Sequence, residues 1–192
     1  MRIQIGRPKP KMPVFLGCEG QSEVGYALFL NSLLKDSQST YFLAIEPLSP
    51  GAGDPEQLVR RTIQILAKTK YSGTKFAKKL VLIDADKLGD NSEWKKQICN
   101  LATENELDII WQSPCHEAFL LHHMEGQQTK QPSDCRMATG LLKKFWTNYQ
   151  KPMDARDIAM SIDIRAVRRA ASVEPAFHAL LVTIGLISTN SR

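Results

Sequence analysis

Four short runs of apolar residues divide the chain, and each has the length of a β-strand. They cover residues 14–18, 41–45, 80–84 and 107–111. Between these runs, apolar residues recur every three to four positions, as they do from Ser92 to Glu104, which predicts helices. A continuous apolar run is typical of a buried parallel strand. The resulting βαβαβαβ order predicts a parallel sheet of about four strands covered by helices, an α/β fold.

Local signals place the starts of two helices. Asp54 is followed by Pro55, a combination that favours a capped helix beginning at the proline. Ser22 follows a glycine-containing turn, and we expect its hydroxyl to cap the helix after the first strand.

After Ser113-Pro114 the pattern becomes entirely helical. Expected helices cover residues 116–125, 134–149, 154–162, 164–171 and 174–186. We therefore expect two parts. Residues 1–124 form an α/β domain with an N-terminal arm, and residues 125–192 form an α-helical extension packed on it.

Composition narrows the class of protein. The chain has 192 residues, of which 43% are hydrophobic and 23% charged, and this excludes wholesale disorder. No apolar run reaches the roughly 20 residues of a membrane span, and the first residues lack the apolar segment of a secretory signal. We therefore expect a soluble cytoplasmic protein without membrane contact.

Net charge and cysteine content restrict the possible functions less than the overall composition does. The net charge is +5, which permits a phosphate-bearing partner without requiring one. Basic groups such as Lys143-Lys144 have an equally simple interpretation as solvated helix faces. The cysteines are Cys18, Cys99, Cys115 and Cys135, and no two have the spacing of a zinc site.

Acidic residues stand where two expected strands end. Glu19 follows the first strand, Asp84 closes the third, and Asp86 comes two residues later. The carboxyl ends of parallel strands meet at one edge of a sheet, where ligands bind in open α/β folds. Clustered carboxylates repel one another unless a cation lies between them, and Mg²⁺ or Mn²⁺ suits such oxygens. The alternative is that these acids only favour solvent-exposed turns.

The motifs around these acids resemble a known fold. A strand followed by Glu-Gly, then a strand ending in Asp-x-Asp, is similar to the Toprim domain of topoisomerases, bacterial primases and related nucleases. Cys18-Glu19-Gly20-Gln21-Ser22-Glu23, Asp84-Ala85-Asp86 and the segment from Ser113 to His123 resemble the RloB family of bacterial antiphage defence loci. The resemblance covers roughly residues 14–124, and it implies that the α/β domain of residues 1–124 is Toprim-like (Rossmann-like).

The third motif departs from the family pattern. That pattern reads Asn-Pro-x-Phe-Glu-x-Trp-x-x-x-His, whereas this chain has Ser113, His116 and Phe119 at the first, fourth and seventh positions. Glu117 and His123 keep their places. Each also has a structural alternative, since Glu117 suits the first turn of a helix and His123 suits a partly buried helix face.

The resemblance implies a Mg²⁺-dependent (or Mn²⁺-dependent) nuclease that acts as the effector of an antiphage system with an ABC/AAA-type ATPase partner. Glu19, Asp84 and Asp86 would bind the metal, Glu19 being alternatively a general base. Glu23, Glu117 and His123 would complete the catalytic site. The substrate is DNA or RNA, tRNA included, and a homo-oligomer is possible. The alternative function is a non-catalytic module that binds and is regulated by the ATPase.

Overall fold

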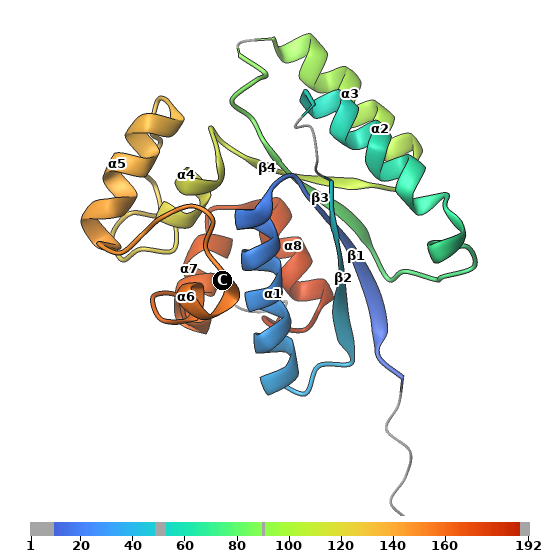
Figure 1. Ribbon diagram of the computed structural model, residues 1–192, viewed down its shortest axis with the longest axis horizontal. Helices are drawn as coiled ribbons and strands as arrows, with labels where there is room; N and C mark the ends of the chain where they lie inside the picture. The colour runs from blue at the N-terminus through green and yellow to red at the C-terminus, as the bar shows by residue number, and fades with distance from the viewer. Residues whose placement is uncertain (1–9, 49–52, 90, 189–192) are drawn as a thin grey trace, which may run out of the picture.

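The computed structural model describes residues 10–48, 53–89 and 91–188, and Figure 1 shows them as a sheet with helices on both faces. The strands are β1 (Met12–Cys18), β2 (Tyr41–Pro47), β3 (Lys79–Asp84) and β4 (Asp108–Gln112). The helices of the sheet region are α1 (Gln21–Asp36), α2 (Pro55–Leu66), a 3₁₀ turn (Thr69–Tyr71) and α3 (Ser92–Glu104). The later helices are α4 (His116–Leu121), α5 (Cys135–Phe145), α6 (Ala155–Ala159), α7 (Ile164–Ala171) and α8 (Pro175–Thr183).

The predicted α/β architecture is confirmed. All strand pairs are parallel, and the order across the sheet is β2-β1-β3-β4. The chain moves from β1 outward to β2 and then returns past β1 to β3. The strand order therefore reverses between β1 and β3, and in open α/β sheets the crevice at such a reversal is the preferred ligand site.

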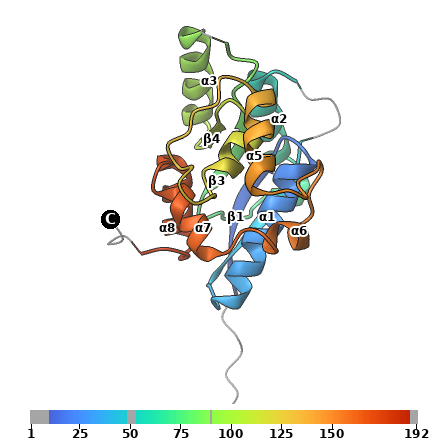
Figure 2. The same cartoon turned by 90° about the vertical axis from the view of Figure 1, so that its left-hand side faces the viewer.

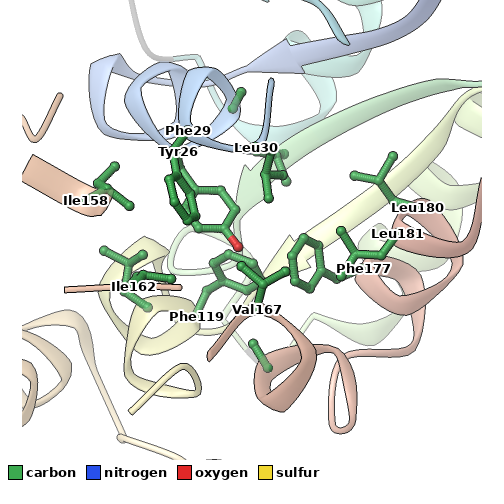
Figure 3. Close-up of a cluster of buried hydrophobic side chains, with 14 of the residues drawn as sticks. Tyr26, Phe29, Leu30, Phe119, Ile158, Ile162, Val167, Phe177, Leu180 and Leu181 are labelled. Atoms are coloured by element: carbon green, nitrogen blue, oxygen red, sulfur yellow. The ribbon is translucent and has the colours of Figure 1, made fainter. Parts of the chain in front are cut away.

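Alternate residues of the strands face two separate cores. Phe15, Val81 and Ile83 pack with α2 and α3 on one side of the sheet. Val14 and Leu16 face the other side, where α1 packs together with the C-terminal helices. Figure 3 shows this second core: its labelled side chains come from α1, α4, α7, α8 and the α6 region. The helical C-terminal part thus packs on the sheet, and the view in Figure 2 shows the same arrangement from the side.

Several helix ends differ from the sequence predictions. Ser22 does not cap α1; its N-cap is Gly20, whose N–H donates to the Glu23 side chain instead. The helix expected over residues 116–125 ends at Leu121, and the one expected over 134–149 ends at Phe145. Trp146 leaves helical backbone angles and buries its ring against Tyr149, which explains the earlier end of α5.

Two further predictions concern the ends of the chain and the membrane. The expected N-terminal arm falls mainly on residues 1–9, which lie outside the described residues. Among the described helices, none is both long and apolar enough to cross a bilayer.

Candidate active site

Glu19 and Asp84 meet at the reversal point of the sheet. Glu19 directly follows β1 and Asp84 is the last residue of β3. The backbone N–H of Asp84 donates to Oε2 of Glu19 at 3.0 Å. The carboxyl ends of β1 and β3, where the sequence predicts an acidic cluster, are therefore adjacent in the fold. This edge is where open α/β sheets bind ligands.

Asp84 lies in a strongly negative environment. Burial raises its pKa to about 8. Three neighbouring carboxylates add to this rise, in decreasing order Glu23, Glu19 and Asp86. The side chain is therefore stable as a carboxylate at neutral pH only when a positive charge compensates it.

Asp86 differs from Asp84 in exposure. β3 ends at Asp84, so the alternation of a strand does not continue to Asp86, which is exposed to solvent. Its charge still acts on Asp84 and Glu19. Asp86 thus borders the acidic cluster from the solvent side.

Glu23 stabilises the start of α1 and also contributes its charge to the acidic cluster around Asp84. Its Oε2 accepts the N–H of Gly20 at 3.0 Å, which completes the first turn of α1. Its Oε1 lies 3.8 Å from Nδ1 of His116. Burial raises the pKa of Glu23, whereas the positive charge of Lys151 lowers it. Glu23 therefore acts as an acid at the start of a helix, and this role does not remove the residue from the site.

Glu117 is fully buried at the start of α4. Its Oε1 accepts the hydroxyl of Tyr149 at 2.7 Å and pairs with Nζ of Lys151 at 2.5 Å. Both partners belong to the segment between α5 and α6. The C-terminal helical part therefore contributes a cation to a site whose acids come from the sheet region.

A close backbone approach positions this segment. The carbonyl group of Met153 passes directly over Gly25 of α1, where any Cβ atom would overlap it. Only glycine allows the two chains to come so near. The contact fixes the path of residues 149–153 over the first turns of α1, and this path carries Tyr149 and Lys151 to Glu117.

His116 is the histidine nearest to the acids. It is buried, its Nδ1 lies 2.7 Å from Nε2 of Gln112, and Nδ1 is also the atom that approaches Glu23. Burial lowers the pKa of His116 to about 3, and the charge of Lys151 adds to the effect. His116 is therefore neutral at physiological pH. Because its Nδ1 accepts the amide N–H of Gln112, its single ring proton lies on Nε2.

His123 lies in the aromatic core. Its Nε2 is 2.7 Å from the hydroxyl of Tyr26, and its Nδ1 is 3.0 Å from the carbonyl oxygen of Phe119. Burial lowers its pKa to about 3. Both ring nitrogens are thus engaged in a neutral, hydrogen-bonded imidazole that packs against Phe177. A catalytic role of His123 stays a prediction, and the structure does not place it in contact with the carboxylates.

Four buried polar atoms around this site lack a partner. Within residues 10–48, 53–89 and 91–188, the buried side-chain atoms without a hydrogen bond are Asp84 Oδ1, Gln112 Oε1, His116 Nε2 and Glu117 Oε2. They come from the end of β3, the end of β4 and the first turn of α4. Buried polar atoms are almost always paired in folded proteins, so a group of unpaired ones at a ligand-binding edge indicates a missing ligand.

The donor set fits a hard divalent cation in chemistry, although the side chains are not arranged around one. In the described parts of the chain, no three His, Cys, Asp or Glu side chains stand together as a metal site. Glu19, Glu23 and Glu117 each accept a hydrogen bond from the protein instead. The unpartnered carboxylate oxygens of Asp84 and Glu117 are nevertheless the ligand type that Mg²⁺ and Mn²⁺ prefer.

Sequence reasoning missed four members of the site: Gln112, His116, Tyr149 and Lys151. His116 lies next to Glu117 and replaces a phenylalanine of the family pattern. This departure from the pattern could have indicated that His116 belongs to the site. Tyr149 and Lys151 carried no such signal, because they lie more than 30 residues beyond Glu117 in sequence and reach it only through the folded path over Gly25.

Comparison with known proteins identifies the family. Residues 14–180 match the family described as RloB-like protein, and the chain belongs to this family. The match extends well past residue 124, so the segment with Tyr149 and Lys151 is part of the family region and not an addition to it. No curated protein and no solved structure matches the chain.

Proposed function

We propose that this chain is a Mg²⁺-dependent (or Mn²⁺-dependent) nuclease that hydrolyses phosphodiester bonds in DNA or RNA. The observation that carries the proposal is a pair of buried, unpartnered carboxylate oxygens, Asp84 Oδ1 at the carboxyl end of β3 and Glu117 Oε2 in the first turn of α4. Buried carboxylates without donors are costly unless a cation or a proton compensates them. A divalent cation is the compensation that also supplies chemistry for phosphate esters.

The residues divide into holding and positioning roles. Asp84 would hold the metal together with Glu19 and Asp86, and Glu117 would join from α4. When bound, the cation polarises the phosphate and stabilises negative charge in the transition state. Glu19 is alternatively the base that accepts a proton from the attacking water. Glu23 fixes the start of α1 beside the cluster through its bond to Gly20.

Lys151 supplies positive charge while no metal is present. Its ammonium group pairs with Glu117 and lowers the pKa of Asp84 and Glu23. Its side chain is about half exposed, so it retains access to solvent and to an incoming anion. We infer that it stabilises the acidic cluster before metal arrives and then attracts the phosphate backbone.

Family membership supports a biological context for this chemistry. The RloB resemblance suggests the effector of an antiphage system with an ABC/AAA-type ATPase partner, and the substrate within that system is DNA or RNA, tRNA included. Possible homo-oligomerisation belongs to the same proposal.

The decisive experiment is a cleavage assay on mixed DNA and RNA substrates with Mg²⁺, Mn²⁺ or EDTA. We expect metal-dependent cleavage that Asp84→Asn and Glu19→Gln strongly reduce. A matched control is Asp108→Asn, since Asp108 is an acid at the opposite end of the same sheet, paired with Lys78. If the Asp84 and Glu19 variants cleave as well as the parent chain, the assignment of the site is wrong.

A second measurement separates the nuclease from the alternative, a non-catalytic module bound to the ATPase. A ligand that binds only the folded state raises the melting temperature as its concentration rises. Mn²⁺ should therefore stabilise the parent chain and not Asp84→Asn. If Mn²⁺ has no effect and the chain co-purifies tightly with the ATPase, the module is favoured.

A further inference from the structure

A pocket of about 430 Å³ opens beside the candidate active site. It is formed by the end of α5, the following segment and the end of α6, which lie together at one side of the molecule in Figure 1. Its lining combines aromatic, thioether and amide side chains, among them Phe145, Trp146, Asn148, Gln150 and Met160. Pockets of this size, lined by aromatic and apolar side chains with a few polar groups, are typical of small-molecule sites.

Two apolar side chains of this pocket are exposed to solvent. Phe145 is 49% exposed and Met160 is 80% exposed, so both present apolar area to solvent. Lysines stand on either side in sequence: Lys143 and Lys144 form the last turn of α5, and Lys151 follows the segment. One acid, Asp157, also lines the pocket.

Direct contacts link the pocket to the acidic cluster. Trp146 lines the pocket, and its ring packs edge-on against Tyr149 with centroids 5.5 Å apart. The hydroxyl of Tyr149 donates to Glu117, and Lys151 pairs with the same carboxylate. A ligand held in the pocket would therefore contact the same segment that supplies the cation of the site.

We propose that this pocket binds an unpaired base of a single-stranded nucleic acid and so selects single-stranded segments as the substrate of the proposed nuclease. Bases stack on exposed aromatic rings regardless of sequence, and basic side chains follow the backbone. The amides and Asp157 offer donors and acceptors to the edge of the base. Bases inside a duplex are already stacked and do not reach such a pocket without being extruded. This inference rests on the proposed function.

The test measures binding without cleavage. A fluorescently labelled single-stranded oligonucleotide and a duplex of the same sequence are titrated with the full chain in EDTA, and anisotropy gives the dissociation constants. For the single strand, we expect Phe145→Ala to weaken binding about 10-fold, because one stacking contact is lost. Phe145→Trp, which keeps a stacking face, should bind like the parent chain.

A matched control is Met137→Ala. Met137 is also on α5 and is 50% exposed, but it is not part of the pocket. We expect it to leave binding unchanged, and we expect the duplex to bind more weakly than the single strand and without dependence on Phe145. Equal effects of Phe145→Ala and Met137→Ala would overturn the inference, as would equal losses for duplex and single strand.

The outcomes also separate this inference from the nuclease proposal. If the chain cleaves with metal while Phe145→Ala binds single strands normally, the base pocket is wrong and the nuclease stands. If single-strand binding depends on Phe145 but no substrate is cleaved, the pocket stands and the nuclease fails. If single strands do not bind and Phe145→Ala instead releases a co-purified protein, the surface is a protein contact and the inference is overturned.

Discussion

Two buried groups of histidine and carboxylate residues lie at the ends of α4, and they differ in how fully they are paired. At its C-terminal end, Nδ1 of His122 lies 2.8 Å from Oε1 of Glu174, and Nε2 lies 2.9 Å from the carbonyl oxygen of Lys130. Both ring nitrogens face acceptors. This group ties the loop after α4 to the start of α8, and every nitrogen of the imidazole has a partner.

The group at the N-terminal end of α4 is incompletely paired. Asp84, His116 and Glu117 each keep one buried atom without a partner there. A folded chain tolerates such atoms where they serve a ligand, and it pairs them where they serve stability. The comparison therefore predicts that substitutions near Asp84 cost activity, whereas substitutions at His122 cost stability.

The largest expected effect follows from Asp84→Asn. The substitution removes a charge that the metal needs, and we expect cleavage to fall by about 10³-fold, as it does when a principal electrostatic contact of a transition state is lost. It also removes a carboxyl group whose pKa is raised by burial and by the neighbouring carboxylates, so the metal-free protein should melt at a higher temperature than the parent chain. Cleavage assays and thermal melts in EDTA measure the two effects.

A control substitution at an acid outside the site shows whether the effects of Asp84→Asn on activity and melting temperature are specific to Asp84. Asp108→Asn should change neither activity nor, beyond a small loss of its exposed pair with Lys78, stability. If Asp84→Asn lowers the melting temperature as well as activity, the unpaired carboxylate is a structural element and the contrast between the two groups fails.

The next largest effect concerns Gly25→Ala. The added Cβ would overlap the carbonyl group of Met153, so the segment that carries Lys151 must move. We expect the free energy of unfolding to fall by about 1–3 kcal/mol, the usual cost of overpacking, and metal-dependent cleavage to fall with it. Chemical denaturation measures the first effect.

Gly140→Ala is the matched control for this glycine. Gly140 lies within α5, and a Cβ atom there would meet nothing within 4 Å. In a helix, alanine is favoured over glycine by about 0.5–1 kcal/mol, so this variant should be slightly more stable than the parent chain. A loss of stability equal to that of Gly25→Ala would mean that the segment over α1 is not held by the close approach.

Some residues of the site could be placed from the sequence, and others could not. Glu19 and Asp84 could be placed together because each ends an apolar run, and parallel strands bring such ends to one edge. The partners of Glu117 could not, because residues 146–154 have no periodicity and their path depends on one backbone contact at Gly25.

The histidines illustrate a second limit. In a helix that reached residue 125, as the sequence predicts, His116 and His123 would lie on one stripe, but α4 ends at Leu121. His122 and His123 therefore follow the helix in a turn, where each finds a separate set of partners. A pattern of residues predicts that a helix exists better than it predicts where the helix ends.

A smaller effect on stability is expected for Lys151→Met. This substitution removes the cation that the protein itself places at Glu117. Without metal, Glu117 would keep the hydroxyl of Tyr149, and stability should fall by about 1 kcal/mol, a modest value because about half of the lysine side chain is exposed to solvent. Mg²⁺ should then raise the melting temperature of Lys151→Met more than that of the parent chain. Lys144→Met, an exposed substitution in α5, is the control, and an identical response of all three proteins to Mg²⁺ would argue against an exchange of lysine for metal at Glu117.

The smallest effect is the pH dependence of the fully paired group. Burial lowers the pKa of His122, but the hydrogen bonds to Glu174 and to the Lys130 carbonyl outweigh it, and the net pKa is raised. A raised folded-state pKa means that His122 contributes its full stability below the unfolded value of about 6.5 and loses it as pH rises through the folded pKa. The difference in unfolding free energy between the parent chain and His122→Gln should therefore be largest near pH 5.5, at about 1 kcal/mol, and shrink towards pH 8.5. The His122→Gln protein should still cleave its substrate at low temperature, because this histidine has no unpaired atom to offer a ligand. A loss of activity in a folded His122→Gln protein would contradict the proposed difference between the two ends of α4.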